Sequence, residues 1–429
     1  MRIDEIFSFE KGVLQSSKCV PGEFNFITAS SDWKTHNEYT HDCEALIFAA
    51  AASGSLGRTH YVNGKFVSSD LCFIITPKDQ ENLPVDLKFY HILFNELKDE
   101  IVRNTKAGTS KEAIGLGSFG KYELPYFDID TQIEIKNRFV NSEEIKSSLS
   151  TELNQQVNLV KKLRQQLLQD AVQGKLVEQN KKEEPASELL KKIKAEKEKL
   201  IAEKKIKQGK IQEAEKQEEL IFDIPRNWTW CTLDEISKNI TDGTHQTPTY
   251  TKDGRIFLSA QNIKPFKFMP EDHKFVSEEA YEDIIKNRKP EKGDILIARV
   301  GAGIGEAAVI NQDIDFCFYV SLGLVQPFKD YLNTDYLTLV INSPYGVKYA
   351  KGNISSKGGS AGNFNLGRIR SFLIPLPPLA EQERIVQKVE ELMQYCNELE
   401  TSIKQSESQN EKLLQQVLRE ALRKEPVEV

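Results

Sequence analysis

The chain has 429 residues, of which 39% are hydrophobic and 28% are charged, and its formal net charge is −7. This length accommodates two or three domains, each with its own core. The longest apolar run, residues 45–52, is too short to cross a bilayer, and the charged N-terminus does not resemble a secretory signal. Six scattered cysteines without a C-x-x-C pair predict a reducing cytoplasm and exclude a disulfide framework or a zinc site.

Residues 1 to about 130 have the pattern of a mixed α/β domain. Short apolar runs at 24–28, 45–51 and 71–76 are bounded by Gly, Ser, Asn and Pro, which is typical of buried strands and turns. A helix is expected from Asp86 to Val102. We therefore predict a first globular domain over residues 1–130.

Residues 131–220 form a predicted helical region with a charged linker at its end. Apolar positions from Ile135 to Leu167 recur in steps of four and three, which predicts one long helix that stops at Gly174. Pro185 begins a second predicted helix that is crowded with Lys and Glu to about Lys207. We interpret it as a solvated helix stabilised partly by i, i+4 pairs.

A second globular domain is predicted over residues 221–378, and Trp228 lies at its beginning. Residues 294–298 read as a buried strand that leads into a glycine-rich stretch at 301–305. Residues 379–429 return to helix, because Ile385 to Val417 repeat the heptad positions of the first long helix.

The sequence repeats itself at a distance of 250 positions, which relates Gly108 to Gly358. Shared Gly, Pro and Ser residues outside the helices keep this offset, which argues against a resemblance of composition alone. Ile47 and Leu56 have counterparts near Ile295 and Ile304, so the globular domains are also predicted to be duplicated. The identical residues of the first copy are Gly108, Ser110, Leu116, Gly117, Pro125, Gln132, Ile135, Leu149, Thr151, Gln155, Lys162, Leu163, Gln165, Gln166, Leu168 and Ala171.

Each long helix of about 45 residues would span about 65 Å and could not bury its apolar stripe alone. We expect the two helices to pair with each other. The predicted fold is α+β: two globular α/β domains separated by a long, antiparallel, two-helix coiled coil, as an internal duplication with pseudo-two-fold symmetry. Parallel pairing is the alternative, and it would bring both domains to one end.

The chain offers no catalytic constellation. Residues 301–305 lack the G-x-G-x-x-G spacing of a dinucleotide site, and we interpret them as a tight turn between strands. His36 and His41 have no third metal ligand in the sequence. Methyltransferase motifs of the N-P-P-[YF] or P-C type are missing, and residues 376–379 lack the polar and aromatic ends of the former.

Positive charge is concentrated in two places that correspond under the repeat. No acidic residue occurs between Asp335 and Glu381, and small polar residues there separate the basic ones. Small residues let backbone N–H groups approach a phosphate, and Lys or Arg neutralises it. Two such segments predict binding of double-stranded DNA, and turns suggest further contacts. The candidate residues are Lys348, Lys351, Lys357, Ser360 and Arg368 with Thr244, His245 and Gln246 in the second domain, and Arg103, Lys106, Ser110 and Lys111 with Lys34 and Arg58 in the first.

The layout resembles the specificity subunits of type I restriction–modification systems. The motifs that carry the resemblance are residues 163–169, 174–176, 185–190, 224–228, 242–245 and 375–382. The resemblance implies two target recognition domains, each followed by a helical conserved region, with no covalent chemistry of their own. The first domain departs from the pattern, because it has Pro125–Asp128 and Gln132 in place of the Pro-Pro-Leu-x-Glu-Gln run.

The resemblance also implies partners. We expect double-stranded DNA, two modification subunits and, through the assembled complex, restriction subunits, but no membrane. S-adenosylmethionine, ATP and Mg²⁺ are expected on those subunits, and no cofactor is expected here. Gln165, Gln166, Gln415 and Gln416 are candidates for binding the modification subunits. The target should be bipartite and asymmetric. A self-sufficient modification enzyme and a coiled-coil scaffold that binds only proteins are the alternatives.

Overall fold

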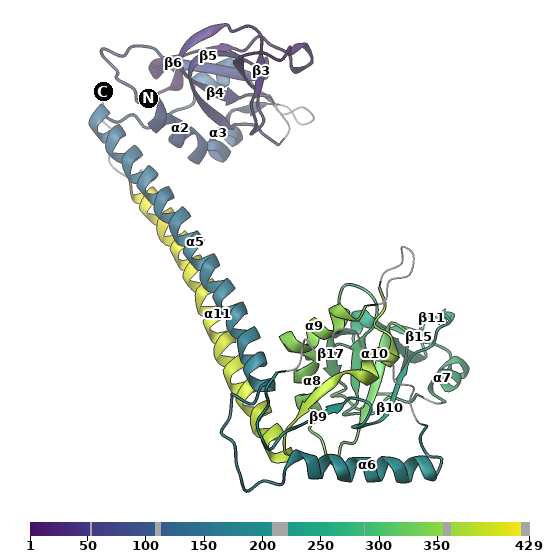
Figure 1. Ribbon diagram of the computed structural model, residues 1–429. Coiled ribbons are helices and arrows are strands. Elements are labelled where there is room, and N and C mark those ends of the chain that lie inside the picture. The colour runs from purple at the N-terminus through teal and green to yellow at the C-terminus, as the bar shows by residue number, and fades with distance from the viewer. Residues whose placement is uncertain (52–53, 108–112, 208–221, 287, 355–361, 422–429) are drawn as a thin grey trace. The chain divides into compact units, whose positions relative to one another are not determined.

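The computed structural model describes residues 1–429 except 52–53, 108–112, 208–221, 287, 355–361 and 422–429 (Figure 1). The chain divides into two compact units. The first unit comprises Met1–Leu153 and Gln405–Val429, and the second comprises Asn154–Lys404. Each unit contains one domain that is built on β-sheets. We call the domain of the first unit the first sheet domain and that of the second unit the second sheet domain.

The first sheet domain is built on a six-stranded sheet with the order β1-β6-β4-β5-β2-β3. β2 and β5 are parallel, and the other neighbouring strands are antiparallel. The strands are β1 Phe7–Lys11, β2 Phe24–Ile27, β3 Lys34–His36, β4 His41–Ala49, β5 Thr59–Ser68 and β6 Cys72–Pro77. The helices are α1 Ile3–Ile6, α2 Leu87–Glu96, α3 Lys98–Thr105 and α4 Leu116–Gly120, and β7 Lys106–Ala107 pairs with β8 Ala113–Ile114.

The central strand β4 is buried on both faces, as its continuous apolar run predicts. Leu46 and Phe48 face a core that includes Tyr90 of α2, whereas Ala45 and Ile47 face a second cluster on the other side of the sheet. The predicted helix from Asp86 to Val102 is corrected by the structure. It is two helices, α2 and α3, which are separated at Leu97.

The second sheet domain contains two four-stranded sheets, with the orders β10-β19-β16-β17 and β11-β15-β12-β18. Their strands are β10 Ser237–Asp242, β11 Tyr250–Thr251, β12 Arg255–Leu258, β15 Lys274–Val276, β16 Ile295–Ala298, β17 Ala307–Val309, β18 Phe316–Phe318 and β19 Leu322–Pro327. β9 Thr229–Thr232 pairs with β20 Leu373–Leu376. The helices are α7 Glu278–Ile285, α8 Thr334–Asn342, α9 Pro344–Gly352 and α10 Leu366–Ser371.

The two sheet domains share one topology, so the predicted duplication extends to the domains. The strand order β1-β6-β4-β5 of the first domain corresponds to β10-β19-β16-β17 of the second. β2 pairs in parallel with the end of β5, and β12 pairs in parallel with β18. Phe66 and Phe316, which take part in these two parallel ladders, are 250 positions apart.

A glycine turn repeats this correspondence in atomic detail. The amide of Gly57 donates to the carbonyl oxygen of Ala49 at 2.8 Å, and the amide of Gly305 donates to that of Ala298 at 2.8 Å. Both glycines have a left-handed backbone, with φ of 81° and 88°. The stretch at 301–305 is therefore a tight turn between β16 and β17, as the sequence indicates.

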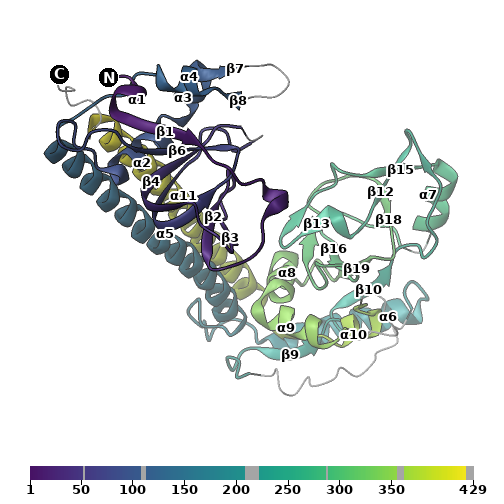
Figure 2. The same cartoon turned by 90° about the horizontal axis from the view of Figure 1, so that it is seen from above.

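The long helices are α5 Ile129–Val172 and α11 Leu379–Ala421, whose first residues are 250 positions apart. In the second unit, Arg164 of α5 pairs with Glu400 of α11 at 2.9 Å, and Arg384 of α11 pairs with Glu183 beyond the end of α5. From the first pair to the second, the residue number rises from 164 to 183 on the side of α5 and falls from 400 to 384 on α11. Within this unit the pairing is therefore antiparallel, and the helices run side by side (Figures 1 and 2).

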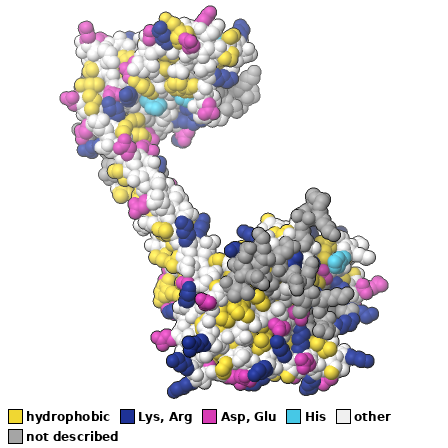
Figure 3. All heavy atoms as spheres, viewed as in Figure 1, with side chains coloured by type: hydrophobic (Ala, Val, Ile, Leu, Met, Phe, Trp, Pro, Cys, Tyr) yellow, Lys and Arg dark blue, Asp and Glu magenta, His cyan; other side chains and the backbone are white. Residues whose placement is uncertain are grey.

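The helix that begins after Pro185 is α6, Ala186–Ala202, and it ends before the predicted limit near Lys207. Its interpretation as a solvated helix is wrong for one face. Ala186, Leu189, Leu190 and Ile193 are buried in the core of the second sheet domain. The remaining face is charged and carries Lys and Glu side chains (Figure 3).

Candidate nucleic-acid interface

The turn at residues 242–246 of the second sheet domain has a fixed backbone. Gly243 permits a close approach, because a Cβ there would lie 2.1 Å from the carbonyl oxygen of Phe318. The amide of Thr244 donates to that same oxygen at 3.0 Å. The guanidinium of Arg288 donates to the carbonyl oxygens of Asp242 and Gly243 at 3.0 and 2.9 Å. Side chains on this turn are therefore presented from a rigid support.

A buried ion pair connects this turn to the basic segment of the same domain. Arg299 is 4% exposed, and its Nη1 donates to Oδ2 of Asp242. The Nε of Arg299 donates to the carbonyl oxygen of Phe364 at 3.1 Å. In return, the backbone amide of Phe364 donates to the carbonyl oxygen of Arg299 at 2.9 Å. Burial lowers the pKa of the Arg299 guanidinium, and the charge of Asp242 opposes that shift. Arg299 thus positions two predicted DNA-contacting segments relative to each other.

The three candidate residues of the turn differ in exposure. His245 and Gln246 are exposed, whereas Thr244 is half-buried and its hydroxyl donates to the carbonyl oxygen of Gln246 at 3.2 Å. Nε2 of His245 lies 3.2 Å from Oδ2 of Asp242, the oxygen that Arg299 also contacts. The turn therefore offers an imidazole and an amide to a ligand.

The basic segment is more structured than a loop. Lys348 and Lys351 are exposed on α9. Arg368 is 8% exposed on α10, and the hydroxyl of Tyr349 donates to its carbonyl oxygen at 2.7 Å. Arg368 is predicted to contact DNA from the basic segment, but it lies on a helix and its side chain is covered by the fold. Lys357 and Ser360 lie outside the described residues.

The first sheet domain places its basic segment in the corresponding part of the fold. Arg103 on α3 and Lys106 on β7 are exposed, and Ser110 and Lys111 lie outside the described residues. The amide of Ile114 donates to the carbonyl oxygen of Ala50 at 2.8 Å, which matches the contact between Phe364 and Arg299. The structure therefore brings the two basic segments to equivalent positions, as the repeat predicts.

The two remaining candidates of the first domain lie in different environments. Lys34 is exposed on β3. Arg58 is half-buried, and its guanidinium donates to the carbonyl oxygen of Ala29 at 3.3 Å and to the hydroxyl of Ser55 at 3.4 Å. Arg58 therefore stabilises the backbone around the Gly57 turn, which is a structural use of its charge.

Sequence reasoning missed a second repeat, which has an offset of 230 positions. Asp4-Glu5-Ile6 recurs as Asp234-Glu235-Ile236. The amide of Ile3 donates to the carbonyl oxygen of Tyr122 at 2.9 Å, and the amide of Leu233 donates to that of Phe372 at 2.8 Å. The identical Asp-Glu-Ile triplets were the signal in the sequence that could have revealed this repeat. They are 230 positions apart, so a comparison of the chain with itself at an offset of 250 does not align them.

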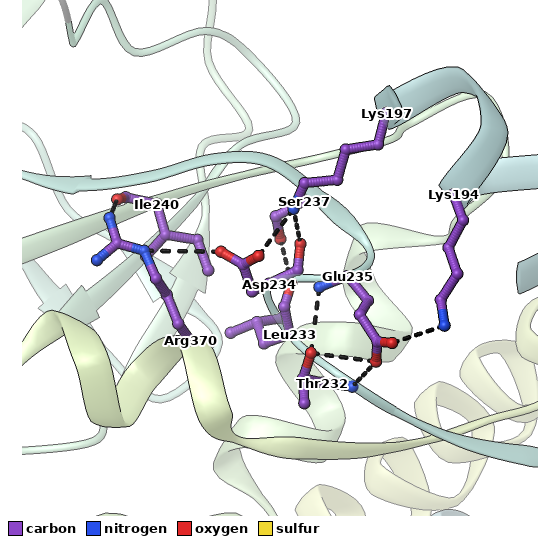
Figure 4. A network of polar contacts seen from close by, with 9 residues as sticks. All are labelled: Lys194, Lys197, Thr232, Leu233, Asp234, Glu235, Ser237, Ile240 and Arg370. Carbon is purple, nitrogen blue, oxygen red and sulfur yellow. Dashed lines mark hydrogen bonds and ion pairs between the residues drawn. The ribbon is translucent and has the colours of Figure 1, made fainter. Parts of the chain in front are cut away.

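This Asp-Glu pair joins α6 to the second sheet domain (Figure 4). Lys197 of α6 contacts Oδ2 of Asp234 at 2.9 Å, and Lys194 contacts Glu235 at 2.7 Å. Arg370 lies 3.6 Å from the other carboxylate oxygen of Asp234 and donates to the carbonyl oxygen of Ile240 in β10. Burial raises the pKa of Glu235, but hydrogen bonds from Lys194 and Thr232 outweigh it and keep that pKa below its usual value.

The long helices expose polar and apolar side chains. Gln165 and Gln166 are exposed on α5, where Gln166 donates to Asp170 at 2.8 Å, and Gln416 is exposed on α11. Gln415 is also on α11, but its side chain lies outside the described part of the chain. Exposed apolar residues of the two helices include Leu159, Leu163, Tyr395, Leu399 and Leu413. The helix pair therefore leaves apolar surface available to another molecule.

Two searches were negative over the described residues. They contain no group of three or more His, Cys, Asp or Glu side chains that could bind a metal ion. Within the same residues, the structure has no helix with the length and apolar character that a membrane crossing requires.

Comparison with known proteins adds to this geometry. The sequence model of the type I restriction modification DNA specificity domain matches residues 1–159 and 225–406. The chain is 33% identical over 251 residues to the type I restriction enzyme EcoAI specificity subunit of Escherichia coli, a match that covers 56% of this chain and 41% of that protein. The EcoEI specificity subunit of Escherichia coli is 28% identical over 257 residues, covering 57% and 42%. The chain therefore spans less than half the length of these relatives.

Solved structures agree on the fold. The crystal structure of the HsdS subunit from Thermoanaerobacter tengcongensis aligns with a TM-score of 0.51 at 17% identity, and the match covers 99% of this chain and 96% of that one. A structure of a type I R-M system, described for its complex assembly and conformational transition, aligns with a TM-score of 0.55 at 17% identity, covering 99% and 97%.

Proposed function

The chain belongs to the type I restriction–modification DNA specificity family, and on this basis we propose that it is the DNA-reading subunit of such a complex. The observation that carries the proposal is the turn at 242–246, which Arg299 connects through Phe364 to the basic segment that includes the exposed Lys348 and Lys351. Basic side chains neutralise phosphates, and polar side chains on a rigid turn can read base edges.

We propose that the two sheet domains read two half-sites of one target. In each half of the chain a sheet domain precedes its long helix. If the whole helices pair antiparallel, as their contacts in the second unit support, the domains would lie at opposite ends of the pair. Because duplex DNA has two-fold symmetry, the domains would then read opposite strands. The domains have diverged, so the target would be bipartite and asymmetric with an unread spacer.

The long helices would recruit other subunits. The exposed glutamines and the exposed Leu159, Leu163, Leu399 and Leu413 offer a surface that a repeated partner could bind twice. We propose two modification subunits per chain, with restriction subunits joining through the assembled complex in the cytoplasm. S-adenosylmethionine, ATP and Mg²⁺ would bind to those subunits, and this chain would catalyse no covalent reaction itself.

Three outcomes distinguish this function from its alternatives. The chain purified alone, and then with its modification subunits, is incubated with duplex DNA and S-adenosylmethionine. The proposal predicts sequence-dependent binding and methylation by the complex and no methylation by the chain alone. Methylation by the isolated chain would identify a self-sufficient enzyme. A chain that forms the complex but does not contribute any DNA binding would indicate a protein scaffold.

A further inference from the structure

The first sheet domain contains a counterpart of the turn at 242–246, although the sequence there is different. The amide of Gly12 donates to the carbonyl oxygen of Cys72 at 2.9 Å, and the amide of Gly243 donates to that of Leu322 at 3.4 Å. Cys72 and Leu322 are 250 positions apart. A Cβ on Gly12 would lie 2.2 Å from the carbonyl oxygen of Ser69, so this glycine is as tightly packed as Gly243.

The next contacts show which residues correspond. The amide of Thr244 donates to Phe318, and the amide of Val320 donates back to the carbonyl oxygen of Thr244, each at 3.0 Å. In the first domain, Leu14 takes the place of Thr244. Its amide donates to the carbonyl oxygen of Ser68 at 3.1 Å, and its own carbonyl oxygen accepts from the amide of Asp70 at 3.1 Å.

Val13 is consequently an additional residue between Gly12 and Leu14. Its amide donates to the carbonyl oxygen of Ser68 at 3.2 Å, the same oxygen that accepts from the amide of Leu14, so the turn has one residue more here than the turn at 242–246. The first domain therefore places an additional side chain between the two anchored residues Gly12 and Leu14. Val13 is 68% exposed, the highest value among the exposed large apolar residues of the described chain. The residues that follow, Gln15 to Lys18, are also exposed.

The first domain fixes this turn without the ion pair of the second. Lys11 stands at the position of Asp242, and Ala50 stands at the position of Arg299. The turn is instead fixed by the backbone hydrogen bonds of Gly12, Val13 and Leu14. The two turns therefore share a place in the fold but present different chemistry, as two readers of different half-sites require.

We propose that Val13 contacts the C5-methyl group of a thymine in the half-site that the first sheet domain reads. The inference rests on the proposed function. Val13 has an isopropyl group and no hydrogen-bonding atoms, and the thymine methyl is the apolar group that a base pair presents in the major groove. The neighbouring Gln15 and Ser16 can read adjacent polar edges, and Lys18 can contact a phosphate.

The test combines a protein methyl deletion with a base methyl deletion. The complex with its modification subunits is assayed for binding to its target duplex, in which each thymine of both half-sites is replaced in turn by deoxyuridine. Removing one buried methyl group should weaken wild-type binding about fourfold at one thymine of one half-site. Val13→Ala, which loses both methyl groups of the isopropyl side chain, should bind thymine and deoxyuridine at that position almost equally, which shows coupling between the isopropyl group and the thymine methyl.

Val140→Ala, an exposed valine of α5, is the matched control and should keep the wild-type sensitivity to deoxyuridine. His245→Ala should alter discrimination in the other half-site only. If Val13→Ala retains the full deoxyuridine effect, or if no thymine is sensitive in the wild type, the assignment of Val13 is overturned while the proposed function stands. If the wild-type complex does not distinguish its target from other duplexes, the proposed function itself fails.

Discussion

Gln132 and Gln382 occupy the same position at the start of the two long helices, and both side chains are fully buried. The amide group of Gln132 accepts from the backbone N–H of Asp86 at 2.8 Å and donates to Phe127 at 2.7 Å. The oxygen of Gln382 accepts from the backbone N–H of Asn333 at 2.9 Å, and its nitrogen donates to Pro377. Asp86 and Asn333 are the N-caps of α2 and α8. Each long helix is thereby bonded to its own sheet domain.

Replacing Gln382 by Leu should destabilise the second unit by about 1–3 kcal/mol, because the amide of Asn333 would lose its partner inside the core. Gln132→Leu should have a similar effect in the first unit. Gln165→Leu, at an exposed position of α5, is the control and should change stability little. Denaturant unfolding measures all three, and a Gln382→Leu variant as stable as the control would contradict this interpretation.

Arg299 should act as a positioning residue for the turn at 242–246. Arg299→Ala leaves Asp242 buried without its partner, which should cost about 3–5 kcal/mol. Arg299→Lys keeps the charge but loses the guanidinium geometry that also contacts Phe364. We expect this variant to fold and to lose discrimination in one half-site while its affinity for unrelated duplexes is unchanged. Equal loss in both half-sites, measured by competitive binding, would argue against this role.

Lys197 should contribute to stability, whereas Lys191 on the same helix should not. The Lys197 and Asp234 side chains are 12% and 13% exposed, but that of Lys191 is 72% exposed. Lys197→Met should lower the free energy of unfolding by about 1–3 kcal/mol, because the Asp234 carboxylate and carbonyl lose a donor. Lys191→Met should change it little. Similar unfolding curves for the two variants would show that the contact between Lys197 and Asp234 does not stabilise the attachment of α6.

The exposed lysines of α9 should set the salt dependence of DNA binding. Replacing Lys348 and Lys351 by Ala should weaken binding to all duplexes and reduce the slope of log affinity against log salt by about 0.9 per lost phosphate contact. Lys191→Ala with Lys192→Ala on α6 serves as the charge-matched control. An unchanged slope in the α9 variant would mean that these lysines face away from DNA. Lys357 belongs to the same prediction, whereas Arg368, being buried, is now expected to affect folding.

The long helices could be predicted closely because their signal is local and repeated. The heptad steps from Ile135 to Leu167 and the offset of 250 placed both helices, and the structure begins them at Ile129 and Leu379. The four-part division of the chain at 130, 220 and 378 remains a prediction. The candidate DNA contacts also remain predictions, although the structure places the two basic segments equivalently.

Long-range contacts could not be predicted from these patterns. Asp242 and Arg299 are 57 positions apart, and no periodicity connects them. The lysines and glutamates of α6 obscured the buried Leu189 and Ile193. Arg368 reads as part of a basic run, but its burial depends on how α10 packs. Val13 was missed because the first residues of the chain repeat at an offset of about 230 positions. The turn at 12–14 therefore does not align with the turn at 242–246 when the chain is compared with itself at an offset of 250.

The most direct measurement of the central claim is the spacing of the methylated target. Seven residues are inserted in register into both long helices, near Gln156 and Ser406, which lengthens each by about 10 Å, equivalent to about 3 base pairs. Methylated adenines are then mapped in cells that produce the variant with its modification subunits. If antiparallel helices separate two reading domains, the spacer between the half-sites will grow while both half-site sequences stay the same. An unaltered spacer in a folded, active variant would contradict the account.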